Sequence, residues 1–261
     1  MDRVTSRDGT HIAYTRTGSG PALILVDGAL CSRGFGPTPA LALQLARDFT
    51  VYTYDRRGRG ESGDTPPYAK QREVEDIAAL ISATGGSACV AGLSSGAMLA
   101  FEAAASGLAI PRVAGYEPPF VYEGNPSSVD HEAALRALLA AGDRSGAVKY
   151  FMRSMVGVPA FAVVFMRMMP WVWRKLAAVA HTLPYDAAVM GDFTVPAARL
   201  AEIHVPTLVM HGARTDARLQ TAARATAAAI PGARHRTLAG QTHNVRPDVL
   251  APALVEFFTE Q

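Results

Sequence analysis

Two serines stand between glycines where an apolar run ends. The segment "CVAGLSSGAMLA", from Cys89 to Ala100, has the pattern of a short buried strand that passes directly into an Ala-rich helix. So sharp a turn needs a glycine on each side and leaves the residue between them strained, with its side chain exposed. The G-x-S-x-G spacing makes Ser94 the candidate nucleophile. The next residue, Ser95, begins the helix, where its backbone N–H could stabilise a developing oxyanion.

A serine nucleophile needs a general base, and the chain has seven histidines. His243 lies in "GQTHNVRP", between the last predicted strand and the last predicted helix, so its loop can reach the end of a sheet. The other six fall in or beside predicted strands, or in a helical segment: His11, His131, His181, His204, His211 and His235. We therefore predict that His243 is the base.

Apolar runs typical of strands alternate with helical segments along most of the chain. The predicted strands are "HIAYTRTG", "PALILVDG", "TVYTYDRRG", "SACVAGLS", "PRVAGYEPP", "VPTLVMHG" and "ARHRTLAG". The predicted helices between and after them are "PALALQLARDF", "KQREVEDIAALISATGG", "SGAMLAFEAAASG", "QTAARATAAAIPG" and "DVLAPALVEFFTEQ". This alternation predicts an α/β fold, with a mostly parallel central sheet flanked by helices.

Residues 119–202 interrupt this alternation, because they contain helical segments and no convincing strand. We expect a helical cap inserted between core segments 1–118 and 203–261. The insertion holds both tryptophans and six of the nine methionines. These side chains could form an ordinary packed core, or a flexible apolar surface over a binding site. On the second interpretation, Met152, Met155 and Trp171 are candidate substrate contacts.

Composition narrows the possible classes of protein. With 49% hydrophobic and 18% charged residues, the chain of 261 residues can bury a sizeable core. A net charge of +2 with scattered basic residues gives no indication of nucleic-acid binding. Two cysteines, Cys31 and Cys89, predict neither a disulfide framework nor a metal site. No signal peptide or membrane span is apparent, so we expect a cytoplasmic protein without metal or cofactor and leave its oligomeric state open.

Several motifs in order resemble the α/β-hydrolase superfamily, particularly its small, capped, esterase-like members. They are "LVDGAL", "YDRRGRGESG", "GLSSGA", "VPTLVMHG" and "GQTH", and they span nearly the whole chain. The resemblance implies the α/β-hydrolase fold with its cap after the sixth strand, Ser94 as nucleophile and His243 as base. It also implies that the backbone N–H of Ala29 is the second oxyanion donor. The DxRGxGxS motif at 55–62 would support the site without taking part in the chemistry.

The triad acid departs from the family pattern. After the seventh strand the family has G-x-x-D, whereas here Asp216 comes one residue later, in "GARTD". We expect Asp216 to be the acid and keep Glu117 in reserve, because some members take the acid from the end of the sixth strand. Alternatively, Asp216 is an exposed loop residue between two arginines, or no carboxylate is suitably placed. A productive acid must approach the histidine within about 3 Å.

The favoured function is a cofactor-independent serine hydrolase acting on an ester, thioester or lactone of a hydrophobic small molecule through an acyl-enzyme. Serine at position 94 disfavours the dehalogenases and epoxide hydrolases of this fold, which use aspartate there. The alternative is a ligand-binding or accessory protein on a degenerate hydrolase scaffold. Two departures motivate it: the displaced acid, and Asp27 where the family usually has histidine. We expect Asp27 to face away from the site.

Overall fold

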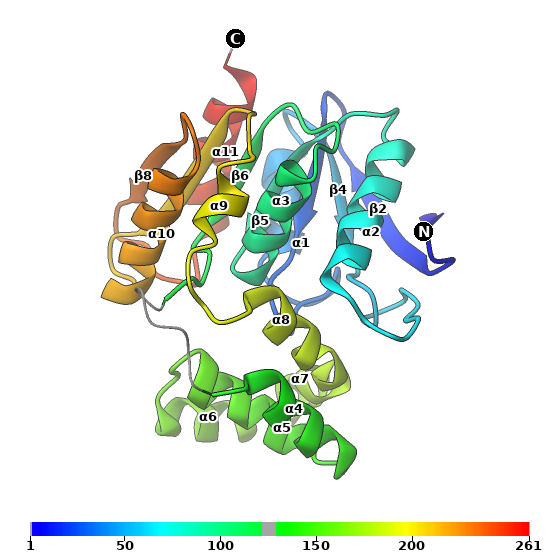
Figure 1. The fold of residues 1–261 in the computed structure, drawn as a ribbon, viewed down its shortest axis with the longest axis vertical. Helices are drawn as coiled ribbons and strands as arrows, with labels where there is room; N and C mark the ends of the chain where they lie inside the picture. Colours follow the sequence, from blue (N-terminus) through cyan, green and yellow to red (C-terminus); the bar gives the residue numbers. More distant parts are fainter. Residues whose placement is uncertain (1, 122–128, 261) are drawn as a thin grey trace.

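A computed structural model describes residues 2–121 and 129–260. Within these ranges eight strands form one sheet in the order β1-β2-β4-β3-β5-β6-β7-β8 (Figure 1). The bounds are β1 (Asp2–Thr5), β2 (His11–Thr17), β3 (Ala22–Val26), β4 (Thr50–Tyr54), β5 (Cys89–Leu93), β6 (Val113–Tyr116), β7 (Thr207–Gly212) and β8 (Arg234–Leu238). Neighbours in the series β4-β3-β5-β6-β7-β8 pair in parallel, whereas β2 pairs antiparallel with both β1 and β4. The predicted mostly parallel sheet is therefore confirmed.

Strand β1 was not predicted. It has four residues, none of them buried, and so lacks the apolar run that marks the central strands β3 to β7. The parallel strands place their carboxyl ends at one edge of the sheet. Leu93, the last residue of β5, lies opposite Tyr116, the last of β6, and Tyr116 lies opposite Met210 in β7. The residues that follow β5 and β6 therefore emerge side by side.

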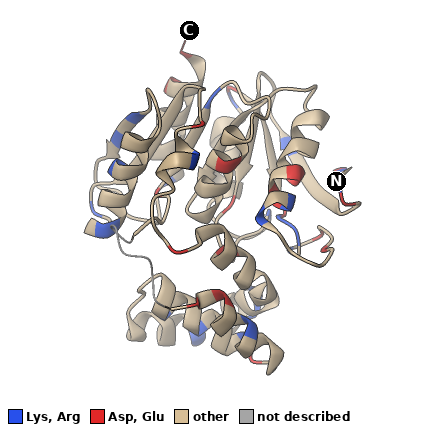
Figure 2. Cartoon of the chain, in the orientation of Figure 1, with Lys and Arg blue, Asp and Glu red and all other residues tan. Residues whose placement is uncertain are grey.

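Helices cover both faces of the sheet (Figure 1). On one face lie α2 (Lys70–Ala83), α3 (Ser95–Ala105) and α10 (Ala217–Ala229), and their buried residues share one apolar cluster. On the other face α1 (Thr38–Leu45) and α11 (Pro247–Thr259) contact each other and belong to a second cluster. The predicted helices on the two faces are thus confirmed, with small shifts at their ends. Lys and Arg are distributed over several helices in the view of Figure 2.

The described part of the segment between β6 and β7 consists of helices joined by short turns and irregular stretches, and no strand occurs in it. It contains α4 (His131–Ala140), α5 (Arg144–Tyr150), a π-helical turn η1 (Phe151–Met155), α6 (Ala160–Arg167), α7 (Pro170–Ala178), a 3₁₀ turn η2 (Ala180–Thr182), α8 (Leu183–Met190) and α9 (Ala197–Leu200). We call α4 through α8 the cap helices, because they lie beyond the edge of the sheet where the parallel strands end (Figure 1). In contrast, α9 packs beside the sheet against α3 and α10. No described helix is long and apolar enough to cross a membrane.

Candidate active site

Ser94 occupies a strained turn between β5 and α3. Its backbone angles are φ 54° and ψ −126°, a conformation that residues other than glycine rarely adopt. The flanking glycines make the turn possible. A Cβ on Gly92 would lie 2.2 Å from the carbonyl oxygen of Gly96, and a Cβ on Gly96 would lie 2.2 Å from that of Val26. The sequence GLSSG therefore forms the sharp strand-to-helix turn that its spacing predicted.

Two backbone N–H groups are available beside Ser94. Ala29 follows β3, and its N–H has no hydrogen-bond partner among the described residues. Its loop comes very close to the nucleophile, since a Cβ on Gly28 would lie 3.1 Å from the Ser94 Cβ. Leu30, the next residue, has φ 61°, so this loop is strained as well. Ser95 is the first residue of α3, where backbone N–H groups lack intrahelical partners.

His243 is hydrogen-bonded to a carboxylate, and that carboxylate belongs to Glu117. The distance from His243 Nδ1 to Glu117 Oε2 is 2.7 Å. Glu117 is fully buried with φ 50°, and it also accepts hydrogen bonds from the Gly212 N–H and the Thr215 hydroxyl. Burial by itself raises the pKa of Glu117, but the bonds from His243 and Gly212 bring it below its usual value. Glu117 is therefore held as a carboxylate against the imidazole.

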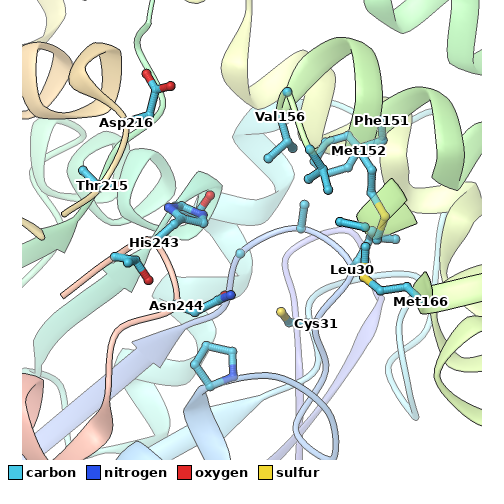
Figure 3. A pocket seen from close by; sticks show the side chains of 18 of the residues that line it. Leu30, Cys31, Phe151, Met152, Val156, Met166, Thr215, Asp216, His243 and Asn244 are labelled. Atoms are coloured by element: carbon cyan, nitrogen blue, oxygen red, sulfur yellow. The ribbon is translucent and has the colours of Figure 1, made fainter. Parts of the chain in front are cut away.

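Asp216 lies elsewhere, contrary to the order of preference that the sequence suggested. It is the N-cap of α10, where its Oδ1 accepts hydrogen bonds from the Arg218 backbone N–H at 2.9 Å and from Arg218 Nε at 3.0 Å. Its side chain is about half exposed and, in Figure 3, its carboxylate points away from His243. The additional loop residue carries Asp216 onto the helix start, where a carboxylate stabilises the unpaired N–H groups. The structure thus brings the reserve residue Glu117, and not Asp216, to His243.

A large cavity lies between the carboxyl edge of the sheet and the cap helices. Its volume is about 1210 Å³, and Ala29, Ser94 and His243 contribute to its wall. The cap contributes mainly apolar side chains, several of which appear in Figure 3. They are Phe151, Met152, Val156, Val158, Phe161, Ala162, Val164, Phe165, Met166, Met168 and Leu176.

The three predicted substrate contacts differ in position. Met152 lines this cavity, and Met155 lines a smaller adjoining cavity of about 70 Å³ that also contains Ser94 and His243. Trp171 lines neither cavity, and 59% of it is exposed on α7. Phe151, which lines both cavities, was not singled out from the sequence. It begins the π-helical turn, a feature often found at functional sites, and the sequence carries no separate signal for such a turn.

Asp27 and Cys31 flank the loop that carries Ala29. Asp27 is buried and is not among the residues that line the cavities, in keeping with the expectation that it faces away. Burial raises the pKa of Asp27 to about 7, although the nearby charges of Arg59 and Arg56 oppose this rise. Cys31 lines the larger cavity, but burial raises its pKa to about 12, so its thiol is a poor nucleophile at neutral pH. No group of metal-binding side chains occurs within the described ranges.

Known proteins resemble this chain in both sequence and structure. Residues 18–253 match the model of the alpha/beta hydrolase family. An alpha/beta hydrolase from Sphaerobacter thermophilus DSM 20745 is 54% identical, with a TM-score of 0.93 over 99% of this chain and 100% of that one. A hydrolase from Pseudomonas aeruginosa PA01 is 27% identical, with a TM-score of 0.80 over 99% and 98%.

More distant structures share the fold. The enol-lactonase from Burkholderia xenovorans LB400 is 21% identical, with a TM-score of 0.75 over 99% of this chain and 100% of that one. A search of curated proteins found no match. The family model covers most of the chain, and the arrangement of β5, Ser94 and α3 is the one that the motif requires. The chain therefore belongs to the α/β-hydrolase family.

Proposed function

We propose that the protein is a serine hydrolase that cleaves a carboxylic ester, thioester or lactone of a hydrophobic small molecule through an acyl-enzyme. Family membership supports hydrolase activity in general. The observation that carries the more specific proposal is the 2.7 Å hydrogen bond from His243 Nδ1 to the buried Glu117 carboxylate. His243 and Ser94 both line the wall of the same cavity. This bond fixes the imidazole tautomer that leaves Nε2 free to accept a proton.

The reaction would proceed in two steps. Ser94 Oγ attacks the carbonyl carbon while its proton passes to His243 Nε2, and the carbonyl oxygen becomes an oxyanion next to the N–H groups of Ala29 and Ser95. Expulsion of the alcohol or thiol, protonated by His243, leaves an acyl group on Ser94. Water then gives a proton to His243, attacks this ester and releases the acid. Each oxyanion donor typically contributes about 3–4 kcal/mol to lowering the barrier.

The substrate class follows from the cavity wall. The cap side chains that line the cavity are almost entirely apolar, so a carbonyl compound with aliphatic or aromatic groups would bury those groups against them. Five of these residues are also exposed: Phe161 by 77%, Met168 by 67%, Phe165 by 59%, Val164 by 58% and Val156 by 46%. We infer that they lie at the entrance and guide apolar substrates inward.

The direct test is the mass of the intact protein after exposure to a small fluorophosphonate. We expect one adduct on the wild type, none on Ser94→Ala, and one on Ser95→Ala, because Ser95 would contribute only its backbone N–H. Turnover of p-nitrophenyl esters and aryl thioesters should be lost in Ser94→Ala and should fall far less in Ser95→Ala, which keeps the backbone N–H and loses only the hydroxyl. An adduct that persists in Ser94→Ala would contradict the proposed nucleophile.

The alternative is a ligand-binding protein on a degenerate scaffold. One of its two grounds was the displaced acid, Asp216. This ground carries less weight because Glu117 makes the bond to His243 that Asp216 does not make. If the wild type gives no adduct under conditions that fully label a control serine hydrolase, the binding function would be favoured instead.

A further inference from the structure

A buried network of charged side chains lies against both oxyanion donors. It consists of Arg56, Arg59, Glu73 and Asp186 together with the hydroxyl of Ser95, and each of these residues is 1% exposed or less. The two arginines belong to the DxRGxGxS loop after β4, to which the sequence assigned no chemistry. Asp186 comes from cap helix α8, about 130 residues later in the chain. Charges buried so completely need partners, and these residues satisfy one another.

Arg59 holds the peptide that carries the first oxyanion donor. Its Nη1 donates a hydrogen bond of 2.7 Å to the carbonyl oxygen of Gly28. This carbonyl and the N–H of Ala29 belong to the same peptide unit, and in a trans peptide the two groups point in opposite directions. With the carbonyl fixed toward Arg59, the Ala29 N–H points the other way, and Ala29 itself lines the cavity. The positively charged guanidinium that donates to this oxygen also polarises the amide, and this makes the Ala29 N–H a stronger donor.

Asp186 links this peptide to the second donor. Its Oδ2 accepts a hydrogen bond of 2.6 Å from Arg59 Nη2, and its Oδ1 accepts one of 2.9 Å from the hydroxyl of Ser95. Arg56 Nη1 also donates to Oδ1, at 2.7 Å, while the rest of its guanidinium makes a two-point contact with Glu73. One carboxylate therefore orients both the arginine behind Ala29 and the side chain of Ser95.

We propose that Arg59 and Asp186 are positioning residues that hold the two oxyanion donors in their productive orientation before substrate binds. This inference rests on the proposed serine hydrolase function. The network acts through the Gly28–Ala29 peptide and through Ser95, and it does not itself contact the reacting atoms. Because Asp186 belongs to cap helix α8, the cap helps to position the oxyanion donors in addition to lining the cavity.

The test compares two buried arginines from the same loop. Arg59→Met removes the hydrogen bond to Gly28, whereas Arg57→Met removes an equally buried arginine whose partners are Asp8, Asp76 and the carbonyl of Arg72. Both variants lose a buried ion pair and should lose thermal stability, but only Arg59 touches the oxyanion loop. Their kcat, KM, fluorophosphonate labelling rate and Tm are measured side by side with a p-nitrophenyl ester as substrate.

Arg59→Met should lower kcat by about 10²–10³-fold with little change in KM, which is the effect of losing one oxyanion donor. Arg57→Met should keep the wild-type kcat despite its lower Tm. A further probe is an alkyl trifluoromethyl ketone, which adds the Ser94 oxygen and forms an oxyanion. Its affinity should fall in Arg59→Met by the same factor as kcat, whereas the affinity of the corresponding secondary alcohol should not change.

Arg59→Lys guards against failure to fold, because it keeps the charge but cannot make the bonds to Gly28 and Asp186 together. We expect its kcat to lie between those of the wild type and Arg59→Met, and Asp186→Asn should likewise lower kcat and ketone affinity in parallel. Wild-type ketone affinity in Arg59→Lys and Asp186→Asn, or equal losses of kcat in Arg59→Met and Arg57→Met, would overturn the proposal. A wild type that no fluorophosphonate labels would instead refute the proposed hydrolase function itself.

Discussion

Replacing Glu117 by glutamine should abolish most of the activity while leaving the fold intact. The carboxylate accepts three hydrogen bonds: from the Gly212 N–H to Oε1, and from His243 and Thr215 to Oε2. Glutamine has one oxygen and one NH₂ group in their place. If its oxygen keeps the bond from Gly212, its NH₂ must face the imidazole. The reverse orientation would bury two facing donors, which is strongly unfavourable.

The magnitude follows from the tautomer that this amide would select. An NH₂ group can only donate to His243 Nδ1, so the imidazole proton would move to Nε2, and Nε2 could then no longer accept the proton of Ser94. Loss of the correct tautomer in a Ser-His-acid triad costs about 10⁴-fold in kcat. This factor corresponds to about 5 kcal/mol of activation free energy. Because the side chain keeps its size, Tm should change much less than activity.

The assay is kcat on a p-nitrophenyl ester, with Asp216→Asn as the matched control. Asparagine caps a helix about as well as aspartate does, so Asp216→Asn should keep kcat within about threefold of the wild type. The fluorophosphonate labelling rate should fall in Glu117→Gln and stay unchanged in Asp216→Asn. A larger loss in Asp216→Asn than in Glu117→Gln would refute the assignment of the acid.

Gly96→Ala should destabilise the fold by about 3 kcal/mol, because its Cβ would meet the carbonyl oxygen that ends β3. Urea unfolding should show no comparable effect for Gly34→Ala, whose Cβ would meet nothing within 4 Å. Asp27 has its pKa raised to about 7 from 3.8, so the folded state binds the proton more tightly and the contribution of Asp27 to stability should be lost as the pH rises from about 4 to about 7. Asp27→Asn should lack this loss of about 4 kcal/mol. If the unfolding free energies of the wild type and Asp27→Asn change with pH along parallel slopes, the raised pKa of Asp27 is excluded. Met152→Ala should raise KM for bulky acyl esters by about tenfold, whereas Trp171→Ala should leave KM unchanged, and equal effects would contradict the cavity assignment.

The motifs that depend on local spacing could be predicted from the sequence. The strand–turn–helix around Ser94 follows from five consecutive residues, and His243 follows from its place between the last strand and the last helix. The parallel sheet follows from alternating segments. Strand β1 was missed because nothing in its four residues distinguishes a strand that lies at the edge of the sheet.

Features that depend on the order of strands in the sheet could not be predicted in the same way. Glu117 was only a reserve candidate because the family pattern places the acid after the seventh strand. That the loop of Glu117 lies near the loop of His243 depends on the strand order β6-β7-β8, which the sequence does not state. The charges of Arg56 and Arg59 were visible, but their partner Asp186 lies in another part of the chain. Buried ion pairs with distant partners leave no periodic pattern, so their role emerges only from the fold.

Pro118 and Pro119 mark a position after which the helical insertion could be exchanged for another. Glu117 makes its hydrogen bonds before these two prolines, whose fixed φ angles stiffen the exit from β6 toward the helical insertion. A different insertion joined after Pro119 would therefore leave the acid in place. At its other end the exchanged segment must stop before α8, because Asp186 in α8 is hydrogen-bonded to Arg59 and to Ser95. Within those two limits, exchange of the helices that line the cavity would leave the proposed nucleophile, base and acid unchanged.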